Sequence, residues 1–177
     1  GELRDSARRL LGERASSSRV RELLDDATGL DRGLWSAMAE LGWPAIAVPE
    51  EFGGMGASFE DLAVVLHELG RQVTPSPMLP TIVAASALAA ALDALRSSLL
   101  PEMVASEQIV TVALSNSGGS YDASQLTVRA TPDAGGVVLD GTARFVPDAH
   151  VADAIVVAAA GDAGAVTLAV VELPSHG

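Results

Sequence analysis

The residues with the clearest chemical potential lie in one polar turn of the second half of the chain. After an apolar run that ends at Leu114, the sequence reads SNSGGS from Ser115 to Ser120. Backbone N–H groups of a glycine-rich turn, together with serine hydroxyls, can hold anions and carbonyl oxygens. A ligand that carries such groups is the functional hypothesis for this turn, and an ordinary polar turn is the alternative.

Other reactive side chains show no arrangement that points to catalysis. The chain has no Cys, which excludes a disulfide framework and thiolate chemistry. No pair of its histidines has metal-ligand spacing such as HxxxH, and His67 falls near the end of a predicted helix, where a surface role is simpler. Glu50 and Glu51 are adjacent, so their side chains point apart and indicate a solvated turn.

The composition predicts a globular protein with an aliphatic core. The 177 residues are 49% hydrophobic but only 3% aromatic, so Ala, Val and Leu must fill the interior. The net charge of -12 argues against a nucleic-acid surface and against electrostatic capture by an anionic membrane. The apolar tract of residues 82–92 is too short to span a bilayer, and the charged N-terminal stretch lacks a signal-peptide core. We therefore expect a soluble cytoplasmic protein.

The first half of the chain predicts helices that must pack on one another. The clearest helix begins at Ser58, a good N-cap, with Asp61 near the positive end of the helix dipole. Its apolar residues follow helical spacing and predict one core-facing side: Phe59, Leu62, Ala63, Leu66 and Leu69. Gly70 suits the left-handed position after a helix end, and Trp35 and Trp43 are expected in the core.

Prolines divide the helical segments that follow. Residues 74–77 read TPSP and forbid continuation of the preceding helix. Residues 78–92 predict a helix that is apolar on all sides and therefore deeply buried. Residues 95–106 predict another helix, in which Pro101 marks a break or a start.

From residue 108 onward the periodicity becomes that of strands. Residues 108–114, 154–159 and 166–172 are β-branched and apolar, and Asp140-Gly141 predicts a hairpin between residues 137–139 and 142–146. Helices followed by strands predict an α+β fold, with an all-helical domain of residues 1–106 and an antiparallel β-barrel-like domain of residues 107–177. The few strands leave open edges, so we expect a truncated β domain and a chain that is a fragment.

One stretch of the helical half carries a family resemblance. It reads GWPAIAVPEEFGGMGAS from Gly42 to Ser58 and continues along the helix as LAVVLHELGR, ending at Arg71. This resembles the N-terminal helical domain of the acyl-CoA dehydrogenase family, whose pattern is Gly-aromatic, an apolar run, P-E-E-[FY]-G-G-x-G and a helix ending in E-E-L/I-G. The resemblance implies a helical domain, then a β-barrel domain, then a further helical bundle that lies beyond this chain.

Members of that family hold FAD partly on two segments of the β domain, and both have counterparts here. Against T-E-P-x-A-G-S-D, Ser115 stands at the flavin-contacting Thr or Ser, and Gly119 and Ser120 match the G-S pair near pyrophosphate and thioester-CoA atoms. Against G-x-K-x-W-I-T-N-G-x-x-A-D, Phe145 stands at the tryptophan that packs against the isoalloxazine, and Pro147 at the flavin-bonding Thr or Ser. The resemblance thus implies cofactor-binding residues Leu114, Ser115, Gly119, Ser120, Phe145 and Pro147, with Ser120 also substrate-binding, and neither a catalytic residue nor a metal ligand in this chain.

Two hypotheses follow from the resemblance. The first is an FAD-dependent acyl-CoA dehydrogenase, which removes the α-proton of an acyl-CoA thioester with a carboxylate from the absent bundle and passes the β-hydrogen to flavin as hydride. Ser115 and Ser120 favour it. The second is a non-catalytic, flavin-deficient partner subunit of a heteromeric acyl-CoA dehydrogenase. Pro147 favours this one because proline has neither a hydroxyl nor a backbone N–H, and so do Asn116 and Ser117, which depart from the family pattern.

The resemblance also implies partners. An acyl-CoA is the substrate, with straight, branched and steroid-side-chain thioesters all open. A homo- or hetero-tetramer and an electron-transfer flavoprotein are the expected protein partners, and lipid or steroid catabolism is the expected setting. An unrelated α+β binding module is the third alternative, and it requires the P-E-E-F-G-G match at residues 49–54 to be chance.

Overall fold

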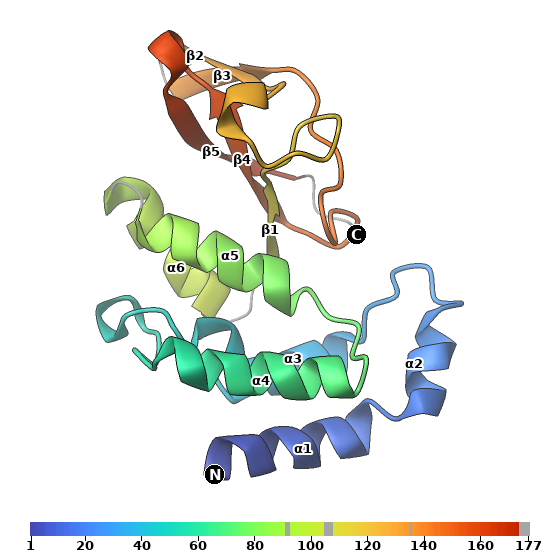
Figure 1. Cartoon of the computed structure of the whole chain (residues 1–177). Coiled ribbons are helices and arrows are strands. Elements are labelled where there is room, and N and C mark those ends of the chain that lie inside the picture. Colours follow the sequence, from blue (N-terminus) through green and yellow to red (C-terminus); the bar gives the residue numbers. More distant parts are fainter. Residues whose placement is uncertain (91–92, 105–107, 135, 174–177) are drawn as a thin grey trace. The chain divides into compact units, whose positions relative to one another are not determined.

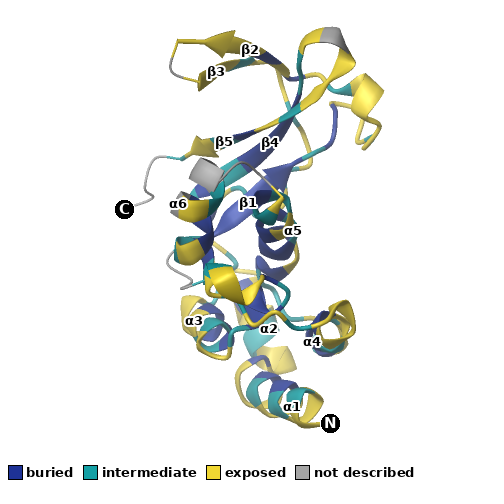
Figure 2. Ribbon diagram, turned by 90° about the vertical axis from the view of Figure 1, so that its left-hand side faces the viewer, coloured by how far each residue is buried: buried dark blue, intermediate teal, exposed yellow. Residues whose placement is uncertain are grey.

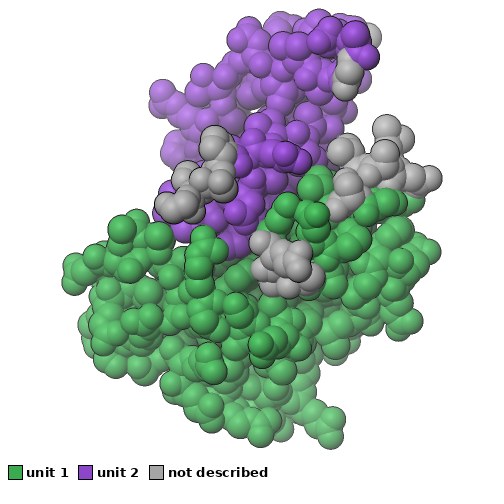
Figure 3. Space-filling view, turned by 180° about the vertical axis from the view of Figure 1, so that it is seen from behind, with its two compact units in different colours: residues 1–108 green, residues 109–177 purple. Residues whose placement is uncertain are grey.

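A computed structural model describes residues 1–90, 93–104, 108–134 and 136–173 of the chain. Its residues form two compact units, Gly1–Gln108 and Ile109–Gly177, which are coloured separately in Figure 3. The domain boundary expected between Ser106 and Glu107 lies outside the described residues, as do the end of the helix expected over residues 78–92 and the end of the one expected over residues 95–106. In the described part of the chain, no helix is both long and apolar enough to cross a membrane.

The first unit is helical, as expected (Figure 1). Its helices and short 3-10 turns are α1 (Glu2–Arg14), α2 (Ser17–Leu23), α3 (Arg32–Glu40), η1 (Trp43–Ala45), η2 (Glu50–Phe52), α4 (Phe59–Arg71), α5 (Met78–Ala89) and α6 (Asp93–Val104). Helix α1 packs against α4, and α5 packs against α6. Helix α6 continues through Pro101, which was expected to break or start it. Ser97, whose carbonyl would pair with residue 101, is exposed, so water can replace that bond.

The core of this unit is aliphatic with two buried indole rings. Trp35 and Trp43 are both buried, as predicted, and so are Leu11, Met38 and Leu62. In Figure 2 the buried residues of α1 and α4 form one side of each helix, which is the amphipathic arrangement that the spacing predicted. Two residues predicted on the core side of α4 are exceptions. Phe59 is 74% exposed, because it occupies the first helical position, before α4 meets the core, and Ala63 is exposed too, while Val65 is buried in addition to the predicted Leu62 and Leu69.

The glycine-rich turn after η1 folds back on the segment that precedes it. The N–H groups of Met55, Gly56 and Ala57 donate to the carbonyls of Ala45, Val48 and Ile46 at 3.1, 2.8 and 2.9 Å. A Cβ added at Gly54 would stand 2.1 Å from the carbonyl oxygen of Val48, so only glycine allows this approach. The close backbone pairing gives a physical reason for the two successive glycines of the P-E-E-F-G-G motif.

Helix α4 begins as predicted and ends differently. Ser58 and Asp61 form a reciprocal capping box, in which Ser58 Oγ accepts from Asp61 N–H and the Asp61 carboxylate accepts from Ser58 N–H. Gly70 was expected in the left-handed position after the helix, but it lies inside α4. Val73 takes that position with φ of 52°, and Val73 N–H and Thr74 N–H donate to the carbonyls of Gly70 and Leu69. These two bonds are those of a Schellman motif, which is normally built on glycine.

A buried carboxylate joins α1 to α4. Glu68 is 1% exposed and forms ion pairs with Arg8 at 3.1 Å, Arg71 at 3.0 Å and Arg4 at 3.6 Å. The hydrogen bond from Arg8 is the largest cause that lowers the pKa of Glu68, ahead of the bond from Arg71; desolvation opposes both. The cluster therefore holds Glu68 as a carboxylate between the two helices.

The second unit is a five-stranded sheet made of β1 (Val110–Ala113), β2 (Arg129–Asp133), β3 (Gly136–Asp140), β4 (Ala154–Ala160) and β5 (Val166–Glu172). The predicted α+β class is confirmed, and the described strands do not close into a barrel. The sheet is not purely antiparallel, however. Strands β2 and β3, and β4 and β5, pair antiparallel, but β1 and β2 both lie parallel to β4. Parallel pairing arises because long connections, not tight turns, join β1 to β2 and β3 to β4.

The expected hairpin at Asp140-Gly141 is wrong. The hairpin in this region is β2–β3, whose register pairs Asp133 with Gly136, and residues 142–146 form no strand. Gly141 has φ of 137°, and a Cβ there would stand 2.2 Å from the carbonyl oxygen of Thr127. The chain therefore passes Thr127 closely at Gly141 and leaves β3 without returning along it.

Candidate functional site

The two segments that carry the predicted site residues lie against each other within the second unit. Ser115 Oγ donates a hydrogen bond to the carbonyl of Arg144 at 2.6 Å. A Cβ placed on Gly119 would stand 3.3 Å from Cε2 of Phe145, so the Phe145 ring covers this glycine. Residues 115–120 and residues 144–147 thus share one surface, although about 25 residues separate them in sequence.

Asn116 organises the first segment from within, a role that the sequence did not reveal. This side chain is buried, and its Oδ1 accepts from the N–H groups of Gly118 at 2.8 Å and Ser120 at 3.0 Å. Its backbone carbonyl accepts from Gly119 N–H at 3.1 Å. Three amides that could have held an anion therefore already donate within the turn. An asparagine in such a polar, glycine-containing stretch is a signal for this kind of turn, because its side chain can accept from backbone N–H groups a few residues on.

The two serines of the turn differ in what they leave available. Ser115 is buried and its hydroxyl proton is committed to Arg144, so it can still accept a hydrogen bond but not donate a second one. Ser120 Oγ accepts from Asp122 N–H at 3.1 Å, which leaves its own proton for a ligand. Leu114, the predicted site residue that precedes this turn, is half-buried and follows β1 directly.

The second segment exposes an aromatic ring in a strained conformation. Phe145 is 70% exposed and has φ of 55°, in the left-handed region that a bulky residue seldom adopts. Such a backbone conformation costs on the order of 1–3 kcal/mol and is found preferentially at functional sites. The exposed Pro147 offers no donor, and its carbonyl accepts from Thr111 Oγ1 at 2.5 Å.

A small core fixes this segment to the sheet. Ala143 and Val146 pack against buried residues of three strands and the residue before β2, namely Ala113, Val128, Ala130, Val157 and Ala159. The inward residues 143 and 146 therefore anchor the segment, while Arg144 and Phe145 are exposed. The anchor explains how a segment that is not a strand can hold a ring in one place.

The charged residues that follow or precede Phe145 closely in sequence are Arg144, Asp148 and His150. Arg144 is exposed and adds a local positive charge to a chain whose net charge is -12. Asp148 also has a left-handed backbone, with φ of 52°. Its partial burial raises the pKa of the carboxyl, an effect that the positive charge of His150 partly opposes. An anionic ligand at this surface would be favoured by Arg144 and disfavoured by an ionised Asp148.

These groups fit one face of a planar, phosphate-bearing cofactor. The Phe145 ring and Gly119 can cover a flat ring, and the Ser120 hydroxyl and the Arg144 guanidinium can meet phosphate or carbonyl oxygens. The donors for the polar edge of a flavin are fewer than expected, because Pro147 has none and Ser115 donates internally. Among the described residues, no three His, Asp or Glu side chains gather where they could hold a metal ion.

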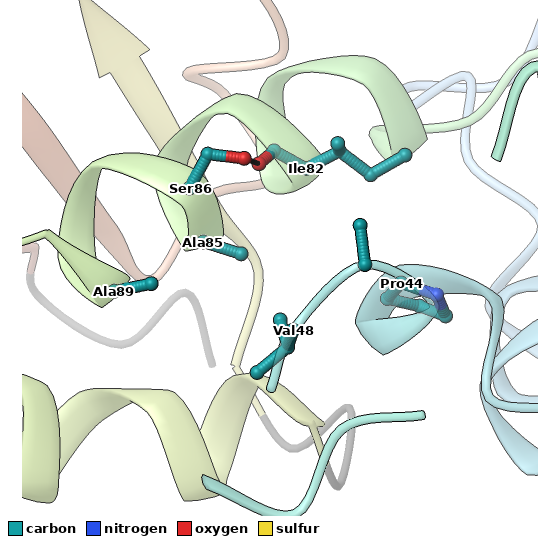
Figure 4. Close-up of a pocket in the computed structure, with 7 residues that line it drawn as sticks. Pro44, Val48, Ile82, Ala85, Ser86 and Ala89 are labelled. Carbon is teal, nitrogen blue, oxygen red and sulfur yellow. Dashed lines mark hydrogen bonds between the residues drawn. The ribbon is translucent and has the colours of Figure 1, made fainter. Parts of the chain in front are cut away.

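A separate hollow in the helical unit offers no such chemistry. It lies between η1 with the segment that follows it and α5, and measures about 20 Å³, which is room for about one water molecule (Figure 4). Its lining residues are Pro44, Ala47, Val48, Ile82, Ala85, Ser86 and Ala89. The hydroxyl of Ser86 donates to the Ile82 carbonyl at 2.9 Å, as Figure 4 shows, so the hollow presents mainly apolar surface.

Comparison with known proteins identifies the family. Residues 1–107 match the family described as acyl-CoA dehydrogenase, N-terminal domain. The chain therefore belongs to the acyl-CoA dehydrogenase family, as the stretch from Gly42 to Arg71 predicted.

Several curated proteins and solved structures are similar to this chain, and one of these structures is a steroid ACAD. The chain is 39% identical over 111 residues to the acyl-CoA dehydrogenase IpdE2 of Mycolicibacterium smegmatis. The aligned region covers 62% of this chain and 35% of that protein. The solved Tcur3481-Tcur3483 steroid ACAD G363A variant matches with a TM-score of 0.87 and 35% identity over 97% of this chain and 47% of that one. The ChsE4-ChsE5 complex from Mycobacterium tuberculosis matches with a TM-score of 0.84 and 28% identity over 97% of this chain and 46% of that one. The chain thus spans about a third of the length of this curated relative and just under half of the two structures.

Proposed function

We propose that this chain forms part of a flavin-dependent acyl-CoA dehydrogenase that introduces a double bond between the α and β carbons of an acyl-CoA thioester. The observation that carries the proposal is the contact of Gly119 with the exposed Phe145 ring, on the two segments where the family holds its cofactor. Bound flavin supplies the hydride acceptor for this reaction, and the protein supplies binding and orientation.

Each residue of the surface has a distinct part in this proposal. Phe145 covers one face of the flat ring, and Gly119 leaves room for the ring to stay there. The Ser120 hydroxyl donates to a thioester or pyrophosphate oxygen, and Arg144 attracts the phosphates. No residue of this chain is assigned as the base that removes the α-proton. The two segments therefore form one wall of the pocket and exclude water from one side of the flavin.

The similar structures suggest the substrate class and the assembly. One is the Tcur3481-Tcur3483 steroid ACAD, which is named for two components, and another is a complex of ChsE4 with ChsE5. On this basis we propose an acyl-CoA thioester on a steroid side chain as the substrate, and a hetero-tetramer as the assembly. An electron-transfer flavoprotein is the proposed acceptor of the electrons, and the cytoplasm the proposed location.

A second function is favoured by the donor set of the site. Pro147 cannot donate to flavin, Ser115 already donates to Arg144, and Asn116 accepts from three amides of the turn. A chain with these features fits a partner subunit that keeps the family fold and interface but holds no flavin alone. The catalytic subunit would then supply the cofactor site of the heteromer.

The absorbance of the purified protein tests both functions. Flavin bands in the protein purified alone support the first, and a colourless protein that becomes yellow only with a second subunit supports the second. Phe145→Ala should weaken flavin binding about tenfold or more, since an aromatic contact of this kind contributes about 1.5 kcal/mol beyond its buried area. No bound flavin under either condition would contradict both.

Pro147→Thr adds a sharper measurement. The Thr111 bond goes to the backbone carbonyl of residue 147, so this substitution keeps that bond while it adds a hydroxyl and an N–H. If the missing donor limits flavin affinity, Pro147→Thr should increase it, and Pro147→Val, which adds the N–H without the hydroxyl, should give a smaller gain. Equal affinities in all three proteins would show that Pro147 does not limit binding.

A further inference from the structure

Three side-chain hydroxyls hold the backbone carbonyls of residues 142–147, which have no strand partner. The bonds run from Thr127 to Thr142 at 2.6 Å, from Ser115 to Arg144 at 2.6 Å and from Thr111 to Pro147 at 2.5 Å. The donors come from three places in the second unit: β1, the turn after it and the residues before β2. These three bonds replace the backbone hydrogen bonds that residues 142–146 would have made to a neighbouring strand.

The best-protected of these donors is Thr111, which the sequence did not single out. It lies in β1, its residue is fully buried, and its hydroxyl points to a carbonyl 36 residues away. A buried hydroxyl needs a partner, and so does a backbone carbonyl that lacks a strand neighbour. This bond satisfies both groups and fixes the end of the segment beyond Phe145.

The bonds enclose the strained residue of the site. Phe145 lies between the held carbonyls of Arg144 and Pro147, with its left-handed backbone and its ring over Gly119. An exposed phenyl ring gains little from water, and a bulky residue avoids this φ region. The hydroxyl bonds on both sides, with Ala143 and Val146 in the core, give the contacts that keep the conformation in place.

We infer that Thr111, Ser115 and Thr127 are positioning residues, which hold the 142–147 segment so that Phe145 presents its ring toward a planar ligand. The identity of that ligand rests on the proposed function, whereas the hold on the segment does not. Ser115 acts in this arrangement through Arg144 and Phe145, in contrast to the direct flavin contact that the family resemblance implied.

Tryptic cleavage after Arg144 measures directly how firmly the hydroxyl bonds fix the 142–147 segment. The scissile carbonyl is the one that accepts from Ser115, so cleavage requires the segment to open. When opening is fast, the rate follows the population of the open form. Loss of one such bond should raise that population roughly tenfold. In the full chain, Ser115→Ala and Thr111→Val should therefore speed cleavage after Arg144 about tenfold. Thr127→Val should do less, since Thr127 is exposed and water can replace its hydroxyl.

Control variants distinguish local opening of the 142–147 segment from a general loss of stability. Thr111→Ser keeps the hydroxyl and should restore slow cleavage, and Thr131→Val, at an exposed position of β2, should change nothing. Arg129, also exposed in β2, is the internal reference site, because global unfolding would speed cleavage after both arginines alike. Equal acceleration at Arg129 and Arg144, or no acceleration in either Ser115→Ala or Thr111→Val, would overturn the inference.

Flavin affinity provides a second readout that fails separately. If the wild-type protein binds flavin, Thr111→Val should weaken that binding by at most the roughly tenfold factor by which the open form increases, because the affinity falls with the fraction of molecules that hold the ring in place. Val170→Ala, which shortens a side chain at a half-buried position of β5 and leaves the three hydroxyls in place, should leave the affinity unchanged. A wild-type protein without flavin contradicts the first proposed function, and the cleavage rates then decide the positioning role on their own.

Discussion

The Phe145 ring lies over Gly119, with its Cε2 3.3 Å from where a Cβ of residue 119 would stand. Gly119 also has φ of 83°, so two separate constraints select glycine here.

We therefore expect Gly119→Ala to displace the Phe145 ring and to lower flavin affinity. The matched control is Gly164→Ala. Gly164 has φ of 80° and no atom within 4 Å of its Cβ position, so it has the same backbone penalty of about 1 kcal/mol without a ring contact. Urea unfolding should show the Gly119 variant as the less stable of the two, and only that variant should lose affinity. An unchanged affinity in Gly119→Ala would mean that the ring does not contact the ligand.

The end of α4 predicts two stabilising substitutions. Gly70 lies within the helix with open space at its Cβ position, so Gly70→Ala should raise the free energy of unfolding by about 0.5–1 kcal/mol. Val73 holds the left-handed position, so Val73→Gly should also stabilise, by up to about 1 kcal/mol after the greater freedom of glycine in the unfolded chain is counted. Denaturant unfolding measures both. Destabilisation by Gly70→Ala would place the end of the helix at Gly70 after all.

The substitution Asp148→Asn should increase the stability of the folded protein by an amount that depends on pH. Burial raises the pKa of Asp148 above its unfolded value, and the charge of His150 opposes this in part. The folded state therefore holds the proton more tightly, and this contribution to stability is lost as the pH rises through the raised pKa. Asparagine, which stays neutral and tolerates the left-handed backbone, should be more stable than wild type near pH 7.

The stability of Asp148→Asn as a function of pH distinguishes between two causes of its advantage over wild type. The advantage of Asp148→Asn should shrink as the pH falls below the pKa of Asp148, where the wild-type side chain is protonated too. An advantage that is the same at pH 4 and pH 7 would show that the backbone preference of asparagine, not the carboxyl charge, is responsible.

The contribution of Glu68 to stability should depend on pH in the opposite direction to that of Asp148. Arg8 and Arg71 lower its pKa through hydrogen bonds, so its contribution is present above the unfolded pKa and is lost as the pH falls through the lowered folded value. Glu68→Gln should therefore destabilise the protein at pH 7 and differ less from wild type in acid, below about pH 4. Glu60→Gln, at an exposed position of the same helix, is the control that should change little. Urea midpoints across this range measure the difference, and a constant gap would exclude a charge effect.

Local chemistry made part of the fold predictable. The capping box joins Ser58 and Asp61, which are three positions apart, and the strand over residues 166–172 follows from a local run of mostly β-branched and apolar residues. Glycine preference points to Gly70 as the left-handed residue after α4. The helix instead extends two residues beyond Leu69, to Arg71, and Val73 takes the left-handed position.

The site depended on contacts that no local pattern encodes. The bonds from Thr111, Ser115 and Thr127 join residues 36, 29 and 15 positions apart, so local patterns alone predict a hairpin strand for the segment that these bonds fix. Family resemblance, not periodicity, pointed to residues 115–120 and 145–147 as neighbours. It did not reveal that Asn116 accepts from the amides of its own turn.

The two tryptophans of the chain, Trp35 and Trp43, are both buried in the helical unit, and its single tyrosine, Tyr121, lies exposed in the other. Selective excitation of the indoles consequently follows the melting of residues 1–108 alone, because an exposed phenol such as that of Tyr121 changes its surroundings little on unfolding. Comparing this signal with far-UV circular dichroism, which reports both halves, can show whether they unfold in one cooperative transition or in two.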